Sequence, residues 1–145
     1  MTTAAKTAFG TELWLAPSGN TLVKVAELLT VTPPTITRDT EDATTHDSAD
    51  GAMEFITDDT YDPGEIPFQT HYIAGSAGDD ALLTASTGGA LQDFKVVVKA
   101  ASGTEDIEGS GYVTGYGPDE LPVKGKQAAS GTIKVSGAAA QAASA

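Results

Sequence analysis

Short apolar stretches, each closed by turn residues, make up most of this chain, and only one segment has the spacing of a helix. Residues 66–73 alternate well, with Ile66, Phe68 and Tyr72 on one face of an extended strand. Similar stretches recur at short intervals, as in antiparallel sheets. The pattern predicts about seven short strands, drawn from the segments 12–15, 22–25, 28–32, 35–38, 53–56, 66–73, 91–99, 107–116 and 131–135.

Two of these strands carry further information. In residues 91–99, we expect Phe94, Val96 and Val98 to face the core, with the neighbouring lysines facing solvent. Residues 109–117 contain four glycines but follow a strand pattern, without the helix start that a nucleotide-binding loop needs. These glycines are expected to let a neighbouring backbone come close.

The helix is predicted over residues 79–87. Asp79 or Gly78 can cap its N-terminus, and a glycine pair ends it. At two to three turns it would not be stable alone. We therefore expect it to lie on a sheet through Leu82 and Leu83.

Apolar periodicity disappears in residues 38–52, which are acidic and rich in threonine, and we expect a long acidic loop there. Residues 138–145 are rich in alanine and are expected to form a flexible C-terminal arm. The overall pattern predicts an α+β, mainly β, fold with an antiparallel β-sandwich or barrel-like core and one short flanking helix. Residues 1–137 are expected to form a single domain.

Composition narrows this picture. A chain of 145 residues fits one domain of ordinary size, and its 16 glycines and 7 prolines suit short strands joined by turns. With no cysteine, disulfides and thiolate metal sites are excluded, and synthesis in a reducing compartment is favoured. The sequence has neither a membrane-spanning apolar run nor the pattern of a signal peptide, so we expect a soluble, unprocessed chain.

The net charge of −12 comes from one block of the chain. Residues 39–94 hold thirteen acidic side chains and no Lys or Arg, whereas the flanking segments are close to neutral. Such a block cannot bind phosphate through clustered cations. The simplest interpretation of this block is a solvated face that aids solubility. A more specific interpretation is a surface that must not bind nucleic acid.

No arrangement of residues points to catalysis, a metal or a cofactor. His46 and His71 are interpreted as ordinary surface residues, not as metal ligands. The pair Gly125-Lys126 lacks the upstream glycine and the following Ser or Thr of a phosphate-binding loop. No serine lies in a Gly-x-Ser-x-Gly motif, and no acidic loop has the ligand set of an EF-hand. We therefore expect a protein that is not an enzyme.

The order of segments resembles a known family. The segments that carry the resemblance are, in order, 25–29, 33–37, 40–46, 54–56, 62–68, the aspartate-capped helix, 94–96 and 111–114. Over residues 10–137 this order is similar to that of the tail tube proteins (major tail proteins) of long-tailed bacteriophages and related gene transfer particles.

The resemblance implies hexameric rings that stack into a hollow tube in the virion tail, built from subunits made in the bacterial host cytoplasm. It implies partners: copies of the same chain, the tape-measure protein, the tail terminator and distal tail proteins. Genomic DNA would pass through the tube without specific binding, and no membrane is involved.

Two sets of site residues follow. A long polar loop with no partner in its own chain is expected to contact an adjacent ring, and a bore that carries DNA is expected to be acidic. The predicted inter-ring residues are Arg38, Asp39, Thr40, Glu41, Asp42, Thr44, Thr45, His46, Asp47 and Asp50. The predicted candidates for the bore are Asp58, Asp59, Glu105, Asp106 and Glu108.

Other functions remain open from the sequence. The same fold could serve as another phage tail or secretion-tube ring protein, such as a tail terminator or a distal tail protein; single rings that never stack would favour this. A calcium- or carbohydrate-binding β-sandwich module is the less favoured alternative, and calcium-dependent thermal stabilisation would support it.

Overall fold

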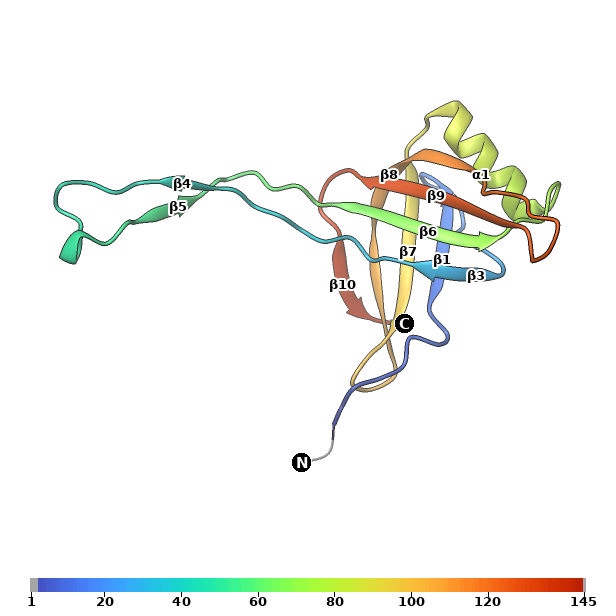
Figure 1. The fold of residues 1–145 in the computed structure, drawn as a ribbon, viewed down its shortest axis with the longest axis horizontal. Coiled ribbons are helices and arrows are strands. Elements are labelled where there is room, and N and C mark those ends of the chain that lie inside the picture. The colour runs from blue at the N-terminus through green and yellow to red at the C-terminus, as the bar shows by residue number, and fades with distance from the viewer. Residues whose placement is uncertain (1–2, 145) are drawn as a thin grey trace.

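A computed structural model describes residues 3–144, and Figure 1 shows a β-rich body from which a long hairpin projects. Within these residues no helix is long and apolar enough to cross a membrane. The elements are β1 (Glu12–Pro17), β2 (Val23–Lys24), β3 (Leu28–Val31), β4 (Thr40–Asp42), the 3-10 turn η1 (Ala49–Gly51), β5 (Phe55–Thr57), β6 (Glu65–His71), α1 (Ala77–Gly88), β7 (Gln92–Lys99), β8 (Thr104–Pro118), β9 (Ala128–Val135) and β10 (Ala140–Ala143).

Eight strands form one bent antiparallel sheet in the order β2-β1-β7-β8-β9-β6-β3, with β10 paired to β8. Strand β8 is 15 residues long and belongs to both halves of this sheet. Its residues 104–111 pair with β7, and its residues 111–118 pair with β9. The register shifts between Val113 and Gly115, a bulge that bends the strand. The halves cross steeply and face each other (Figure 1), which confirms the predicted mainly β, antiparallel fold.

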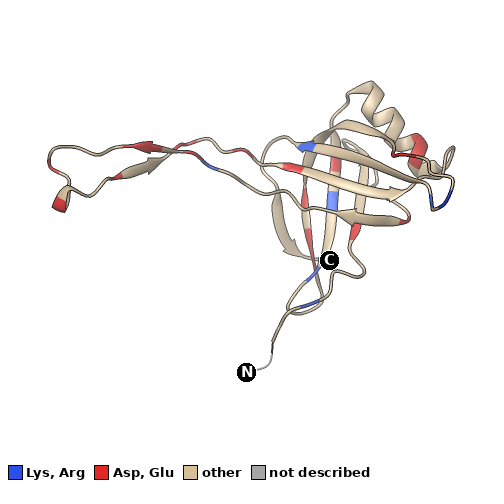
Figure 2. Cartoon of the chain, in the orientation of Figure 1, with Lys and Arg blue, Asp and Glu red and all other residues tan. Residues whose placement is uncertain are grey.

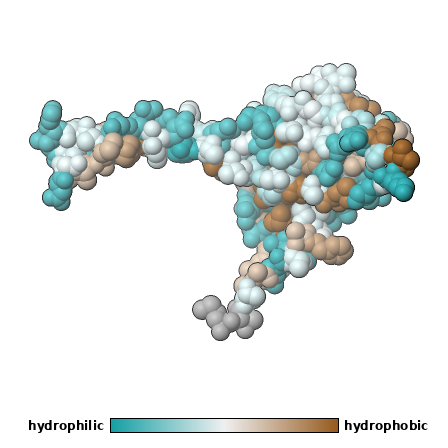
Figure 3. Space-filling view, in the orientation of Figure 1, coloured by the Kyte–Doolittle hydropathy of each residue, from teal (hydrophilic) through white to brown (hydrophobic). Residues whose placement is uncertain are grey.

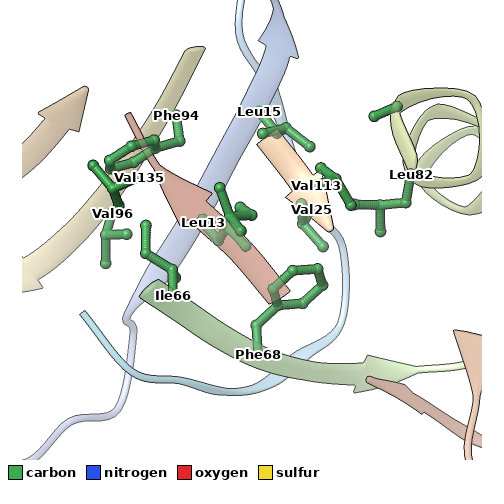
Figure 4. Packing of buried hydrophobic residues seen from close by; sticks show 12 residues of the cluster. Leu13, Leu15, Val25, Ile66, Phe68, Leu82, Phe94, Val96, Val113 and Val135 are labelled. Carbon is green, nitrogen blue, oxygen red and sulfur yellow. The ribbon is translucent and has the colours of Figure 1, made fainter. Parts of the chain in front are cut away.

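The core fills the space between the two halves of the sheet (Figure 4). Phe94 and Val96 of β7 and Ile66 and Phe68 of β6 are buried, as their alternation predicted, whereas Val98 is only half-buried. The other buried members of the cluster are Leu13, Leu15, Val25, Leu82, Ala85, Val113, Ile133 and Val135.

Glycines allow close approach at Gly111, as the glycine-rich strand predicted, and at Gly131 of β9, whereas Gly115 and Gly117 of the predicted run face open space. A Cβ atom on Gly111 of β8 would lie 2.5 Å from the carbonyl oxygen of Lys134 on β9. A Cβ atom on Gly131 of β9 would lie 2.6 Å from the Phe68 ring. Any side chain at either position would therefore push the neighbouring strand away.

Helix α1 packs on the second half of β8, and its extent is close to the predicted 79–87. The predicted cap is wrong: Ser76 is the N-cap, and its hydroxyl accepts a hydrogen bond from the Asp79 N–H at 3.2 Å. Leu82 and Ala85 face the sheet, but Leu83 does not and is 44% exposed. Adjacent residues of a helix are rotated by about 100°, so Leu82 and Leu83 cannot both point into the core.

The Asp79 side chain has another role, which explains why it does not cap the helix. Its carboxylate is buried and accepts hydrogen bonds from the Tyr116 hydroxyl at 2.8 Å and from the Gly75 N–H at 3.1 Å. This contact ties the start of α1 to the end of β8. Burial and the hydrogen bond to this carboxylate raise the pKa of Tyr116 well above its usual range.

Stability should therefore depend on Tyr116 at alkaline pH. Because the pKa of Tyr116 is raised in the folded state, its hydrogen bond contributes fully to the free energy of unfolding below pH about 10, the ordinary tyrosine pKa. This contribution is lost as pH rises above that value. Tyr116→Phe should lower the free energy of unfolding by about 1–3 kcal/mol at pH 7, since it leaves a buried carboxylate short of a donor. Between pH 9 and 11, its stability should fall less steeply than that of the parent chain.

Urea unfolding at pH 7, 9, 10 and 11 measures both effects. Tyr112→Phe is the matched control, because Tyr112 is 41% exposed. Parallel alkaline curves for the parent and Tyr116→Phe would contradict the prediction.

Two predictions about loops need correction. Residues 140–143 are not a flexible arm, because they form β10 and pair with residues 105–108 of β8. Alanine has little β-propensity, so the pattern gave no sign of this strand. Residues 38–52 are not entirely loop: Thr40–Asp42 forms β4, paired with β5. The predicted strand over 35–38 is reduced to one bridge between Thr37 and Asp62.

Candidate assembly interface

The feature without a place in the core is the hairpin arm, which we define as residues 35–64. It continues strands β3 and β6 of the body and projects far beyond it (Figure 1). At its root, Gly64 has φ +96°, and a Cβ atom there would lie 2.5 Å from the Thr35 carbonyl oxygen. Glycine is therefore required where the two chain segments meet.

A charged contact ties this root to the body. The Lys134 ammonium of β9 lies 2.9 Å from the Asp62 carboxylate, which also accepts the Gly64 N–H at 2.9 Å. The Lys134 contact, helped by the Gly64 N–H, lowers the pKa of Asp62. A lowered carboxylate pKa means that this contact is complete at neutral pH and is lost as the solution becomes strongly acidic.

The rest of the arm is held by local hydrogen bonds. Along the two strands, the Asp58 N–H donates to the Asp39 carbonyl at 2.9 Å, and the Ala43 N–H donates to the Glu54 carbonyl at 2.8 Å. At the tip, the Ser48 hydroxyl donates to the Glu54 carboxylate at 2.9 Å. The arm therefore has a defined shape without any apolar core.

Apolar side chains on the arm are left in water. Met53, Phe55 and Ile56 are 63%, 56% and 59% exposed, and Ile36 near the root is 57% exposed. Phe55 and Ile56 are consecutive in a strand and point to opposite sides of the hairpin. Figure 3 shows a brown patch among hydrophilic atoms on this part of the arm. Exposed apolar groups on both sides of a slender hairpin favour its insertion between other protein surfaces.

The arm also carries most of the net charge. It holds nine acidic side chains and one basic one, Arg38, and Figure 2 shows the resulting red segments along it. Arg38 is used locally: its guanidinium donates to the Asp58 carbonyl at 2.6 Å and lies 5.0 Å from the centroid of the Tyr61 ring. A surface that receives this arm therefore has to tolerate or neutralise its carboxylates.

The structure brings the predicted inter-ring residues together. All ten of them, from Arg38 to Asp50, lie on the arm, and all ten are exposed. The apolar members of the same surface, Met53, Phe55 and Ile56, were read only as an ordinary strand. The sequence did contain a signal for them: three apolar residues in a short strand follow the polar segment 38–52, which offers no apolar residues to cover them.

The predicted candidates for the bore are not brought together. Asp58 and Asp59 lie on the arm, whereas Glu105, Asp106 and Glu108 lie on β8 in the body. Asp106 is only 9% exposed and accepts a hydrogen bond from the Ser144 hydroxyl at 2.6 Å. It does not present a carboxylate to solvent in this chain. Glu108 is exposed and pairs in register with Lys95 of β7.

The histidines are also separate. His46 lies at the arm tip, and His71 ends β6, where its Nδ1 is 3.3 Å from the Glu27 carboxylate. Among residues 3–144, no group of three His, Asp or Glu side chains is placed to hold a metal ion.

The sequence of this chain matches a known protein family. A family model described as lambda phage tail tube protein matches residues 6–142, which is nearly the whole chain. The chain belongs to this family. The predicted resemblance is therefore confirmed: this tail tube protein is a structural subunit of a phage tail. No curated protein has a sequence that matches it.

Solved structures share the fold at low sequence identity. The chain is similar to a protein in the tail of an empty GTA particle (TM-score 0.77, 15% identity, covering 96% of this chain and 100% of that one). It is also similar to a protein in the anti-feeding prophage baseplate (TM-score 0.73, 6% identity, covering 99% of this chain and 98% of that one). A third similar structure is that of the SPP1 tail tube (TM-score 0.64, 12% identity, covering 95% of this chain and 80% of that one). Proteins of very different sequence thus share this sandwich.

Proposed function

We propose that copies of this tail tube protein form hexameric rings, that the rings stack into a hollow tube, and that the hairpin arm joins each ring to the next. The observation that carries the proposal is the arm itself. It exposes Phe55 on one side and Ile56 on the other, and it has no core of its own. Covering such a segment with another protein surface would remove its apolar side chains from water and stabilise it further.

Relatives of the same fold support the sixfold ring. The GTA tail was refined with C6 symmetry, and the anti-feeding prophage baseplate was symmetrised sixfold. The SPP1 relative comes from an assembled tail tube. Because the arm contact joins different surfaces of two copies, it does not close on itself and can repeat along an axis.

The charge of the chain suits a tube through which DNA passes. A net charge of −12 gives the assembled protein little capacity to release counterions from phosphate, so DNA would slide without being held. The exposed carboxylates of Asp59 and Glu108 remain candidates for the bore. In this proposal the tape-measure protein occupies the tube first, the terminator and distal tail proteins cap its ends, and the subunit has no catalytic role.

Electron microscopy of the purified chain tests this proposal. We expect sixfold rings at low protein concentration and stacked tubes at high concentration, or when tail partners are added. Single rings that never stack would instead favour a tail terminator or distal tail protein. A chain that stays monomeric under all of these conditions would contradict the proposal.

A further inference from the structure

The loop between β8 and β9, residues 119–127, lies at the end of the body opposite to the hairpin arm (Figure 1). It exposes two apolar side chains: Leu121 is 56% exposed and Val123 is fully exposed. Figure 3 shows brown atoms beside teal ones at this end of the molecule. Both ends of the long axis therefore present apolar groups within a polar surface.

The same loop carries two lysines that have no partner in their own chain. Within the described part of the chain, Lys124 and Lys126 form no ion pair and no side-chain hydrogen bond, and both are exposed. Figure 2 shows a basic, blue segment at this end of the molecule. Most of the other lysines are engaged: Lys24 with Glu12 (3.3 Å), Lys134 with Asp62 (2.9 Å), Lys99 with Thr7 (3.1 Å) and Lys95 over the Trp14 ring (4.6 Å).

We propose that this loop is the receiving surface for the hairpin arm of a second copy. Leu121 and Val123 would cover apolar groups of the arm, while Lys124 and Lys126 would face its carboxylates. The pairing is complementary in both charge and hydrophobicity. It rests on the proposed function, and it specifies which face of the next subunit the arm meets.

The loop also holds two acidic residues, one of which is engaged by its own sheet. The Asp119 carboxylate is turned to its own sheet, where it accepts hydrogen bonds from Gln69 and from Ser130, both at 2.9 Å. Glu120 is exposed at the start of the loop. The segment 121–127, which bears the apolar residues, carries two lysines and no acidic side chain.

A second basic and apolar segment exists near the N-terminus, and it is the rival receiver. Lys6 is exposed there, and Phe9 is 87% exposed. However, this segment leaves the body across the long axis and not at the end opposite to the arm (Figure 1). Only a receiver at the opposite end continues the axis of the arm from one copy to the next.

Charge reversal tests the inference. Lys124→Glu/Lys126→Glu should reduce the pelletable tube fraction about tenfold or more in low salt, because like charges would then face the arm. The salt dependence should also shift, since screening relieves the new repulsion. Adding Glu41→Lys/Asp47→Lys on the exposed arm should restore stacking. Lys6→Glu/Lys99→Glu, with the same change in net charge, is the matched control and should stack nearly normally.

Each result has one meaning. Unchanged stacking of Lys124→Glu/Lys126→Glu, or no rescue by the arm substitutions, overturns this inference. Equal loss in the Lys6→Glu/Lys99→Glu control overturns it too, since net charge alone would then explain the effect. If removing the arm also leaves stacking intact, the proposed function of the arm fails with it. If arm removal blocks stacking while the loop reversal does not, only the receiving surface is wrong. Unchanged thermal unfolding of each variant establishes that it is folded.

Discussion

Replacing residues 40–57 by the two-residue turn Asn-Gly is expected to give a folded protein that no longer forms stacked tubes. The replacement joins Asp39 to Asp58, which are already neighbours across the hairpin through a 2.9 Å backbone hydrogen bond. An Asn-Gly turn can connect two such paired strands, because its backbone twist matches the twist of the strands. The removed residues include no member of the core, so the unfolding midpoint should change by only a few degrees. Electron microscopy and sedimentation measure the loss of tubes.

A smaller change tests whether stacking needs the apolar side chains of the arm or only its hairpin. Phe55→Ser/Ile56→Ser keeps the hairpin and its charges, and it should also weaken stacking, since burying each of these side chains is worth about 1.5–3 kcal/mol. Thr40→Ser, which changes neither charge nor apolar area appreciably, is the control. Tubes of normal length from the shortened chain would exclude the arm as the joint between rings.

Phe94→Ala should have the largest effect on the body. Phe94 is 1% exposed, and its ring lies over Gly109 of β8, where a Cβ atom would be only 3.0 Å away. Because a glycine of β8 faces the ring, that position offers no side chain to fill the space that truncation leaves. We expect a loss of about 3–5 kcal/mol in the free energy of unfolding. For a chain of this size, that corresponds to a fall of roughly 10–15 °C in the unfolding midpoint.

The matched control for this substitution is Phe9→Ala. It removes the same atoms from a side chain that is 87% exposed and should change stability by no more than about 0.5 kcal/mol. Urea unfolding at low protein concentration, where rings and tubes dissociate, gives both values. A similar loss at the two positions would mean that the core is not where the alternation of β6 and β7 places it.

The sandwich could be predicted because its strands have one buried face. In β6 and β7, each apolar residue that points inward is followed by a residue that points outward, and the sequence shows that alternation directly. Strand β10 has no such contrast, because alanine looks the same on either face. The Ser76 cap was missed for a different reason. Asp79 is an equally good cap in isolation, and only the distant Tyr116 decides that its carboxylate is used elsewhere.

The arm could be predicted only in part. Its lack of apolar periodicity identified a segment without a place in the core, and its charges were visible in the sequence. Its strands could not be predicted, because β4 and β5 have no buried side and pair through backbone groups alone. The loop with Lys124 and Lys126 carried no signal either. Its meaning depends on lying opposite to the arm, which is a property of the folded chain.

The direct continuation of β3 and β6 into the arm has a mechanical consequence. Tension on the arm pulls along the length of β6, which pairs with β9 at seven consecutive positions from Glu65 to His71. A load in this direction shears all of those pairs together, instead of unzipping them one after another. Strand β9 passes the load to β8, which spans both layers. If the arms join rings as proposed, whole sheets would resist tension along the tail, and the slender hairpins would supply the compliance that lets it bend.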